Sequence, residues 1–380
     1  MRLGIEGSNL RAGGGVTHLV ELLKAADPKE SGIDEVVVWS GGATLSQLPQ
    51  RPWLVPVHAP QLDGALPMRV AWQQFVLPSL AAQTDVMFVP GATPLRVKPP
   101  VITLSQNMLP FELDERGRFG WSVMGMKLRV LEHSQTRAFR KANGVVFLTR
   151  YAQMMVQRRI GHLSSRQAII PHGIADAFRC KPRPSYPIHD YSKDHPFRLV
   201  YVSIINLYKH QWFVAEAVAN LRQAGLPIAL DFIGPAYAPA LKRLQHVLER
   251  VDPARDFIRY LGPISYDKLA SYYRGADAFV YASSCENLPI ILLEAMASGL
   301  PIACSDRGPM PEVLGEAGIY FDPEVITSVE SAIKALVVDQ ARRAHCAAMG
   351  FEHSQKYSWE RCARETFDFI ASMVDRADDL

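Results

Sequence analysis

Two acidic residues, Glu286 and Glu294, flank the largely apolar run "NLPIILL" just after a predicted strand. A carboxylate can accept hydrogen bonds from two hydroxyls at once, as a vicinal diol of a ribose or hexose offers them. Asn287 is predicted to cap a helix with Pro289 in its first turn, where free amides attract anions. The pattern favours a ligand with hydroxyls at both ends and phosphates between them, such as a nucleotide sugar. Spacing alone also allows a surface acid at Glu286 and a buried ion pair between Glu294 and an arginine.

Other residues that could bind phosphate also follow predicted strands. Lys209 stands at a predicted helix start after the strand at 197–203, although a lone lysine there is usually a solvated surface residue. The run Gly13–Gly15 follows the strand at 2–6, and glycine lets a backbone approach a ligand closely. The run is not a dinucleotide-binding G-x-G-x-x-G, because position 18 is His18.

Amide and imidazole side chains provide further candidates. The strand at 101–105 ends in a polar turn with Gln106 and Asn107, whose amides can bond hydroxyls but cannot act as a base at neutral pH. His133 lies on a basic predicted helix, and His172 lies in the turn "PHGIADAF". For each histidine the sequence allows two interpretations, contact with a ligand or a purely structural role.

Short β-branched runs alternate with amphipathic stretches along the whole chain, which predicts an α/β fold with parallel sheets covered on both faces. Ligands bind such sheets beyond the carboxyl ends of the strands, where the candidate residues stand. The predicted strands are 2–6, 35–39, 86–90, 101–105, 144–148, 168–171, 197–203, 228–234, 257–262, 278–283 and 301–305. The predicted helices are 16–26, 67–82, 121–141, 150–160, 209–224, 238–250, 266–274, 289–298, 326–338 and 357–374.

The segment 181–196 is rich in proline and charge and lacks periodicity, which is typical of a linker. We therefore predict an N-terminal domain over 1–180 and a C-terminal domain over 197–356, both doubly wound. The C-terminal helix within 357–380 is expected to pack back on the first domain.

Composition excludes several classes of protein. The chain has 380 residues, 48% of them hydrophobic, which is enough for two or three ordered domains. A net charge of +3 gives no reason to expect nucleic acid as a partner. We expect a cytoplasmic protein, because the five cysteines show no paired spacing and neither a signal peptide nor a membrane-spanning run is recognisable. The oligomeric state is not predictable.

Several motifs in the second half occur together in one known family. The E-x7-E pair is preceded by "LGPISYDKLASYYRGADAFVYAS" and followed by "AMASGLPIACS" and "GPMPEVLGEAGIYFDP". This order resembles the C-terminal domain of retaining glycosyltransferases of family 4, within the glycosyl transferases group 1. The first half resembles the family more loosely. The resemblance implies a GT-B fold, in which two tandem Rossmann-like domains face a cleft, the first binding the acceptor and the second the nucleotide-sugar donor.

The resemblance also implies roles for single residues. Glu286 would contact the transferred sugar, Glu294 the ribose diol and Lys209 the donor diphosphate. The residues assigned to catalysis are Glu286, Lys209, Gln106 and Asn107. Donor contacts are assigned to Glu286, Glu294 and Lys209, and further to Asn287, Leu288, Pro289, Ser203, Gly234, Pro263, Ile264, Gly14 and Gly15. His133 and His172 are assigned to the acceptor side.

This chain departs from the family at three places. The family usually has "E-G-F-G" where this chain has "ENLP", so Asn287–Pro289 put the identity of the donor sugar in question. Pro289 also removes one amide donor. Ile204 stands where an arginine for the diphosphate is expected, and Gln106 or Asn107 replaces a common histidine.

These features predict a hexosyltransferase that uses a GDP- or UDP-linked sugar, with mannose favoured, and a glycan or lipid-linked acceptor in cell-surface polysaccharide synthesis. No D-x-D motif occurs, so we expect no metal and no cofactor. Between Phe111 and Arg166, eleven Lys or Arg face four Asp or Glu, which suggests contact with an anionic inner membrane surface or solvated helix faces. Two alternatives remain: a non-catalytic nucleotide-sugar or glycan-binding protein, and a GT-B nucleotide-sugar epimerase.

Overall fold

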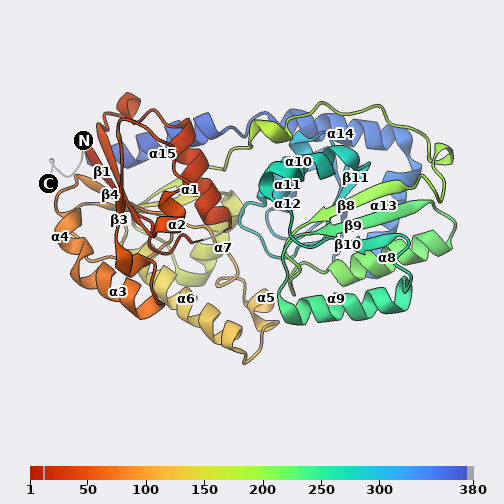
Figure 1. Cartoon of the computed structure of the whole chain (residues 1–380), viewed down its shortest axis with the longest axis horizontal. Coiled ribbons are helices and arrows are strands. Elements are labelled where there is room, and N and C mark those ends of the chain that lie inside the picture. The colour runs from red at the N-terminus through yellow and green to blue at the C-terminus, as the bar shows by residue number, and fades with distance from the viewer. Residues whose placement is uncertain (12, 375–380) are drawn as a thin grey trace. The chain divides into compact units, whose positions relative to one another are not determined.

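The computed structural model describes residues 1–11 and 13–374, which form two compact units (Figure 1). The described residues of the first unit lie within Met1–Arg116, Trp121–Gly173 and the C-terminal segment 357–374. The second consists of Ile174–Lys356 and the short segment Gly117–Gly120. The segment predicted as a linker is tied to the second unit, because Arg343 Nε donates to Ser185 Oγ at 3.1 Å.

The first unit is built on a parallel sheet in the order β3-β2-β1-β4-β5-β6-β7. The strand order reverses between β1 and β4, which makes the carboxyl ends of these strands the switch point of this sheet. All four residues of β4 and β6 are buried, as expected for strands covered on both faces. The strands are β1 (Arg2–Glu6), β2 (Glu35–Ser40), β3 (Leu54–His58), β4 (Val86–Val89), β5 (Val101–Leu104), β6 (Gly144–Phe147) and β7 (Arg166–Ile169).

Helices flank this sheet, and the C-terminal helix α15 packs on α1. Ser122 and Thr149 cap α6 and α7, each accepting a bond from a backbone amide three residues on. The longer helices are α1 (Gly14–Ala25), α3 (Leu66–Phe75), α6 (Val123–Lys141), α7 (Arg150–Ile160) and α15 (Trp359–Ala371). The shorter ones are α2 (Gly42–Leu45), α4 (Leu77–Ala81) and α5 (Leu113–Gly117).

The second unit is built on a parallel sheet in the order β10-β9-β8-β11-β12-β13. Here β8 and β11 are direct neighbours, so the loops that follow them lie at the same edge. The strands are β8 (Phe197–Val202), β9 (Ile228–Ile233), β10 (Ile258–Tyr260), β11 (Ala278–Tyr281), β12 (Ile302–Ser305) and β13 (Gly318–Phe321).

The helices of the second unit lie on both sides of its sheet in Figure 1, with α8 and α9 on one side and α10 and α11 on the other. In α11 the six residues 292–297 are all buried, which explains its almost wholly apolar sequence. The helices are α8 (Gln211–Gln223), α9 (Ala238–Val251), α10 (Tyr266–Gly275), α11 (Ile290–Ala297), α12 (Met310–Leu314), α13 (Ile326–Val338) and α14 (Gln340–Ser354).

The predicted fold class is confirmed, since both units are doubly wound α/β structures. The strands β3 and β13 were not predicted, nor were the helices α2, α5, α12 and α14. The predicted helix 67–82 is two helices, α3 and α4, which meet at Val76 just before Pro78. No helix among the described residues combines the length and apolar character needed to cross a bilayer.

Candidate functional site

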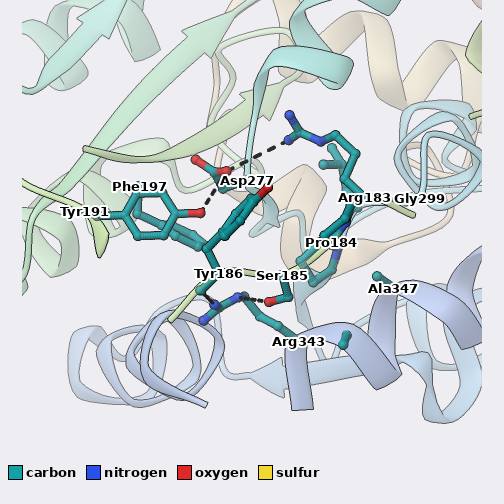
Figure 2. A pocket seen from close by; sticks show the side chains of 13 residues that line it. Arg183, Pro184, Ser185, Tyr186, Tyr191, Phe197, Asp277, Gly299, Arg343 and Ala347 are labelled. Atoms are coloured by element: carbon teal, nitrogen blue, oxygen red, sulfur yellow. Dashed lines mark hydrogen bonds and ion pairs between the residues drawn. The ribbon is translucent and has the colours of Figure 1, made fainter. Parts of the chain in front are cut away.

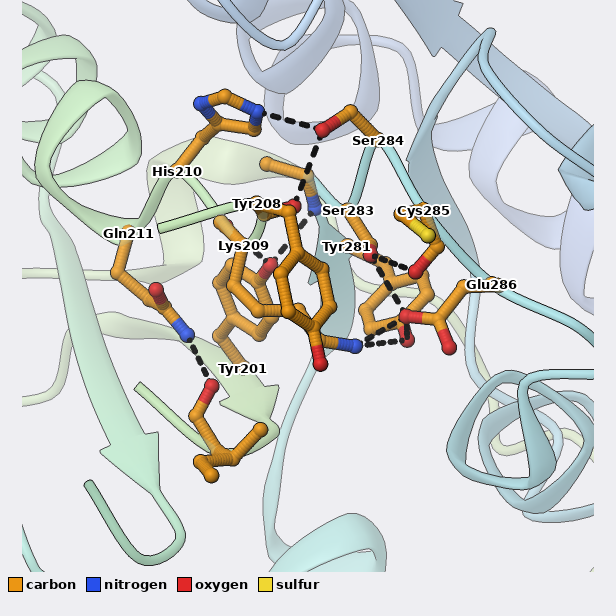
Figure 3. Close-up of polar contacts among 12 residues, drawn as sticks. Tyr201, Tyr208, Lys209, His210, Gln211, Tyr281, Ser283, Ser284, Cys285 and Glu286 are labelled. Carbon is orange, nitrogen blue, oxygen red and sulfur yellow. Dashed lines mark hydrogen bonds and ion pairs between the residues drawn. The ribbon is translucent and has the colours of Figure 1, made fainter. Parts of the chain in front are cut away.

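The loops after β8 and β11 bring Lys209 and Glu286 into direct contact (Figure 3). Lys209 Nζ lies against Glu286 Oε1 and 3.0 Å from the hydroxyl of Tyr281, the last residue of β11. The Lys209 side chain is 5% exposed and that of Glu286 is 16% exposed. A cation this deeply buried needs such an anionic partner, so each side chain stabilises the charge of the other.

One oxygen of Glu286, Oε1, receives the hydrogen bonds that the described residues give to this carboxylate. Ser283 Oγ donates to Glu286 Oε1 at 2.6 Å, and the Tyr281 hydroxyl and the Lys209 ammonium donate to the same oxygen. The Tyr281 hydroxyl donates its single proton to Glu286 and accepts from Lys209, so the bonds are mutually consistent. The hydrogen bonds to Glu286 among the described residues all end on Oε1 and leave the other oxygen, Oε2, without one. This oxygen is available for a ligand hydroxyl.

Tyr201, in β8, connects the same two loops by hydrogen bonds. The hydroxyl of Tyr201, in β8, donates to the backbone oxygen of Lys209 at 2.5 Å and accepts from the amide of Ala282 at 3.2 Å. Tyr201 is 1% exposed. The backbone that carries Lys209 is therefore fixed to the backbone that leads to Glu286.

Glu294 is buried inside α11. Its side chain accepts a hydrogen bond from the Tyr273 hydroxyl at 3.2 Å, and its Oε1 has no hydrogen-bond partner among the described residues. Burial raises the pKa of Glu294 to about 8, against bonds from Tyr266 and Tyr273 that favour the ionised form. Among the described residues, Glu294 has two tyrosines and no arginine as interaction partners, so the alternative of a buried ion pair is wrong. The alternative of a surface acid at Glu286 is also wrong, because its side chain is 16% exposed.

The predicted cap at Asn287 is also wrong. Helix α11 begins at Ile290, and the residue before it is Pro289, whose extended backbone (φ −76°, ψ 95°) keeps it outside the helix. Asn287 therefore stands too far from the first helical amides to cap them. Asn287 and Leu288 are 6% and 7% exposed, which places both inside the second unit beside Glu286.

Ser203 and Gly234 meet where the loops after β8 and β9 approach each other. A Cβ added to Gly234 would lie 2.2 Å from the backbone oxygen of Ser203, and Gly234 has φ 142°. The amide of Gly234 bonds the oxygen of Gly262, which leads into the turn with Pro263 and Ile264. Pro263 is exposed and Ile264 is partly exposed. These predicted residues therefore follow neighbouring strands of one sheet, while Ser203 Oγ has no partner among the described residues.

In the first unit, Gly15 lies against Gln106. Helix α1 begins at Gly14, and a Cβ added to Gly15 would lie 3.0 Å from Gln106 Oε1. Gln106 Nε2 is buried and has no hydrogen-bond partner in the part of the chain that the structure describes. Asn107 is exposed, and its side chain accepts from the amide of Leu109 at 3.1 Å. The glycine run at the start of α1 and the turn with Gln106 and Asn107 therefore lie together beyond the carboxyl ends of β1 and β5.

The two predicted acceptor-side histidines lie in different surroundings. His133 is exposed on α6. His172 is buried, with its Nδ1 2.7 Å from Nδ1 of His18, and both rings pack on Trp359. Burial lowers the pKa of His172 to about 4, so the pair is neutral at physiological pH. The structure gives His172 a packing partner that the sequence did not predict.

A pocket of about 240 Å³ lies at the opposite edge of the second sheet (Figure 2). Its lining includes Phe197, which begins β8, and Asp277 and Pro301, which precede β11 and β12. None of the predicted site residues lines it. Among the described residues, no group of three His, Cys, Asp or Glu side chains could hold a metal ion.

Sequence reasoning missed four residues of the Lys209–Glu286 region: Tyr281, Ser283, Ser284 and His210. Three of them follow or end β11, so their position at a strand end was a usable signal. His210 gave no such signal, because its role depends on a contact with another loop.

Comparison with known proteins finds a family match within the second unit. Residues 189–353 match the family of glycosyl transferases group 1. The O-antigen chain mannosyltransferase B of Escherichia coli is 35% identical over 112 residues, which are 30% of this chain and 29% of that protein. A GDP-mannose-dependent alpha-(1-6)-phosphatidylinositol monomannoside mannosyltransferase of Mycobacterium tuberculosis is 24% identical over 77% of each chain.

The fold has solved counterparts over its full length. Sucrose-phosphate synthase from Thermosynechococcus elongatus superimposes with a TM-score of 0.77 at 16% identity, covering 99% of each chain. At this identity the likeness concerns the fold, which is GT-B as predicted.

Proposed function

We propose that this chain, which belongs to the glycosyl transferases group 1, is a retaining hexosyltransferase with a nucleotide-diphosphate sugar as its donor. The acceptor would be a hydroxyl of a glycan or lipid-linked glycan in cell-surface polysaccharide synthesis. A GDP- or UDP-linked hexose is expected, with mannose favoured because both relatives named above are mannosyltransferases. The contact between Lys209 and Glu286, within the matched region, carries the proposal.

The two glutamates would bind hydroxyls at the two ends of the donor, the transferred sugar and the ribose. Glu286 Oε2 would accept a hydroxyl of the transferred sugar, while Oε1 stays bound to Lys209, Tyr281 and Ser283. Ionised Glu294 would accept the ribose diol through the oxygen that now has no partner among the described residues. The Lys209 ammonium has three protons, of which two go to Glu286 and Tyr281, so the third can meet the diphosphate.

The transfer step needs no side-chain base. The bond between the anomeric carbon and the diphosphate oxygen breaks, and the acceptor oxygen bonds to the same face of that carbon. The acceptor proton passes to the leaving phosphate, whose negative charge Lys209 stabilises. Because Ile204 supplies no second cation, this step depends on Lys209 more than it would with an arginine there. We propose that no metal takes part; unchanged turnover in excess EDTA would agree with this, and loss restored by a divalent ion would refute it.

The exposed face of the α6 region supports docking at an anionic membrane, which would bring a lipid-linked acceptor to the first unit. Trp121, Val123 and Val130 are 88%, 86% and 69% exposed, and Lys127 and Arg137 are exposed on the same helix. Exposed apolar side chains beside cations are the pattern of interfacial helices. We therefore propose the cytoplasmic face of the plasma membrane as the place of action. Flotation with liposomes that contain anionic lipid tests this, and equal flotation with neutral liposomes would contradict it.

A screen of nucleotide sugars tests the donor. A ligand that binds the folded state raises the melting temperature, so GDP-mannose, UDP-glucose and other hexose donors can be ranked by thermal shift. The best donor is then incubated with the protein and its products are analysed. Free nucleoside diphosphate with an α-linked product from an α-linked donor supports the proposal. Binding without sugar release indicates a non-catalytic binder, and a new nucleotide sugar indicates an epimerase.

A further inference from the structure

Ser284 joins the two loops that carry Lys209 and Glu286. Its amide donates to the backbone oxygen of Tyr208 at 2.9 Å, and its hydroxyl donates to the same oxygen at 3.2 Å. The Ser284 hydroxyl also lies 2.8 Å from Nε2 of His210. Ser284 thus contacts the residues on both sides of Lys209 and stands two positions before Glu286 (Figure 3).

These contacts fix the proton on His210. A serine hydroxyl has one proton, so both contacts of Ser284 Oγ are hydrogen bonds at the same time only when that proton points to Tyr208 and the imidazole donates to the serine oxygen. Burial lowers the pKa of His210 to about 4, which leaves one ring proton at neutral pH. The arrangement that satisfies both contacts has this proton on Nε2. The other nitrogen, Nδ1, is buried without a hydrogen-bond partner among the described residues.

The backbone of His210 is in a conformation that side-chain-bearing residues rarely adopt. It has φ 51° and ψ 28°, in the left-handed region, and stands immediately before α8. Its ring is fully buried and lies 5.8 Å and 6.0 Å, between centroids, from the rings of Trp212 and Phe213. Such a conformation persists when its surroundings hold it, and it is common at functional sites. The Ser284 bond and the aromatic packing provide that restraint one residue after Lys209.

We propose that His210 and Ser284 are positioning residues, whose hydrogen bond clamps the Lys209 loop to the Glu286 loop. The clamp holds the Lys209 ammonium on Glu286 Oε1 and leaves Oε2 free for a sugar hydroxyl. A flexible lysine side chain loses much conformational freedom when it is held in one place, so a fixed backbone favours the ordered state. The effect on transfer rests on the proposed function, whereas the clamp itself is independent of it.

Hydrogen exchange measured by mass spectrometry tests the clamp without any ligand. Ser284→Ala removes the hydroxyl, and Ser284→Thr keeps one. Exchange in peptides covering 205–211 and 281–287 should be about tenfold faster in Ser284→Ala, the size expected for one lost buried hydrogen bond. Ser284→Thr should restore slow exchange. Ser271→Ala is the control, because it removes a hydroxyl in α10 whose one hydrogen bond among the described residues goes to the backbone oxygen of Lys268, at 2.7 Å.

The His210 ring provides a second readout. Nitrogen-15 spectra of the wild type should show the Nε2–H form, and Ser284→Ala should lose this fixed form. His210→Asn removes the imidazole, and asparagine tolerates the left-handed backbone. This variant replaces Ser284→Ala in the test if Ser284→Ala does not fold. A double variant should be no more impaired than the worse single variant, because both changes break one bond.

The functional readout separates this inference from the proposed function. GDP and UDP are the calorimetric probes, and kcat and KM are measured with the donor that the wild type uses. Ser284→Ala should lower kcat about tenfold with a smaller change in KM, and Ser284→Thr should recover most of it. If the wild type bound no nucleotide, the proposed function would be wrong. The hydrogen-exchange comparison would still show whether Ser284 and His210 hold the two loops together. Faster exchange confined to 281–287, or wild-type kcat in Ser284→Ala, would overturn the positioning role.

Discussion

The buried carboxyl of Glu294 should make the stability of the second unit depend on pH. Its pKa is raised from the ordinary 4.5 to about 8 by burial, so between these values the folded state holds a proton that the unfolded state has released. Stability from this group is complete below pH 4.5 and is lost as the pH rises through 8. The slope is about 1.4 kcal/mol per pH unit, or at most about 5 kcal/mol across the window.

Glu294→Gln isolates this contribution, because an amide has the shape of the protonated acid and does not titrate. Urea unfolding of both proteins is followed at pH 5, 6, 7 and 8, with hydrogen exchange of α11 to report on the second unit alone. The variant should match the wild type at pH 5 and become progressively more stable than it toward pH 8. Other titrating groups are common to both proteins and cancel in the difference. A difference that stays constant with pH would refute the reasoning.

Gly234, Glu294 and Trp121 each allow a further prediction. Gly234→Ala should destabilise the second unit by roughly 1–3 kcal/mol in thermal unfolding, because φ 142° and the backbone at 2.2 Å leave no room, whereas Gly275→Ala, with nothing within 4 Å, should have little effect. GDP or UDP affinity should rise toward pH 8 in the wild type and be flat in Glu294→Gln by calorimetry, since a diol needs the ionised acid; equal pH profiles would contradict this. Trp121→Ala should reduce flotation with anionic liposomes without lowering the melting temperature, because the side chain is 88% exposed.

Most strands of both sheets were predictable because parallel strands buried on both faces have continuous apolar sequences. Residues 36–38 of β2 are three buried valines, and such runs need no tertiary information to be identified. Strand β3 was missed because its sequence contains Pro56 and three of its five residues are exposed, as at the edge of a sheet. Strand β13 is only four residues long and starts with a glycine, so it has no clear pattern.

Single residues of the site could be predicted from the sequence, but the contacts between them could not. Lys209 and Glu286 could be identified from strand ends and from the family resemblance, yet their contact depends on β8 lying next to β11. No local pattern specifies that neighbourhood. The cap at Asn287 was predicted wrongly because the helix start depends on the backbone of Pro289. The left-handed backbone of His210 follows from tertiary contacts alone.

The most direct test of the account is donor binding and transfer by the wild type beside Lys209→Met, which keeps an apolar stem of similar length but no charge. We expect the wild type to bind a nucleotide-diphosphate hexose, release the nucleoside diphosphate and form a glycoside with the donor's anomeric configuration. We expect Lys209→Met to stay folded and to lose at least tenfold in kcat. Equal kcat in the two proteins, or an inverted product, would contradict the central claim.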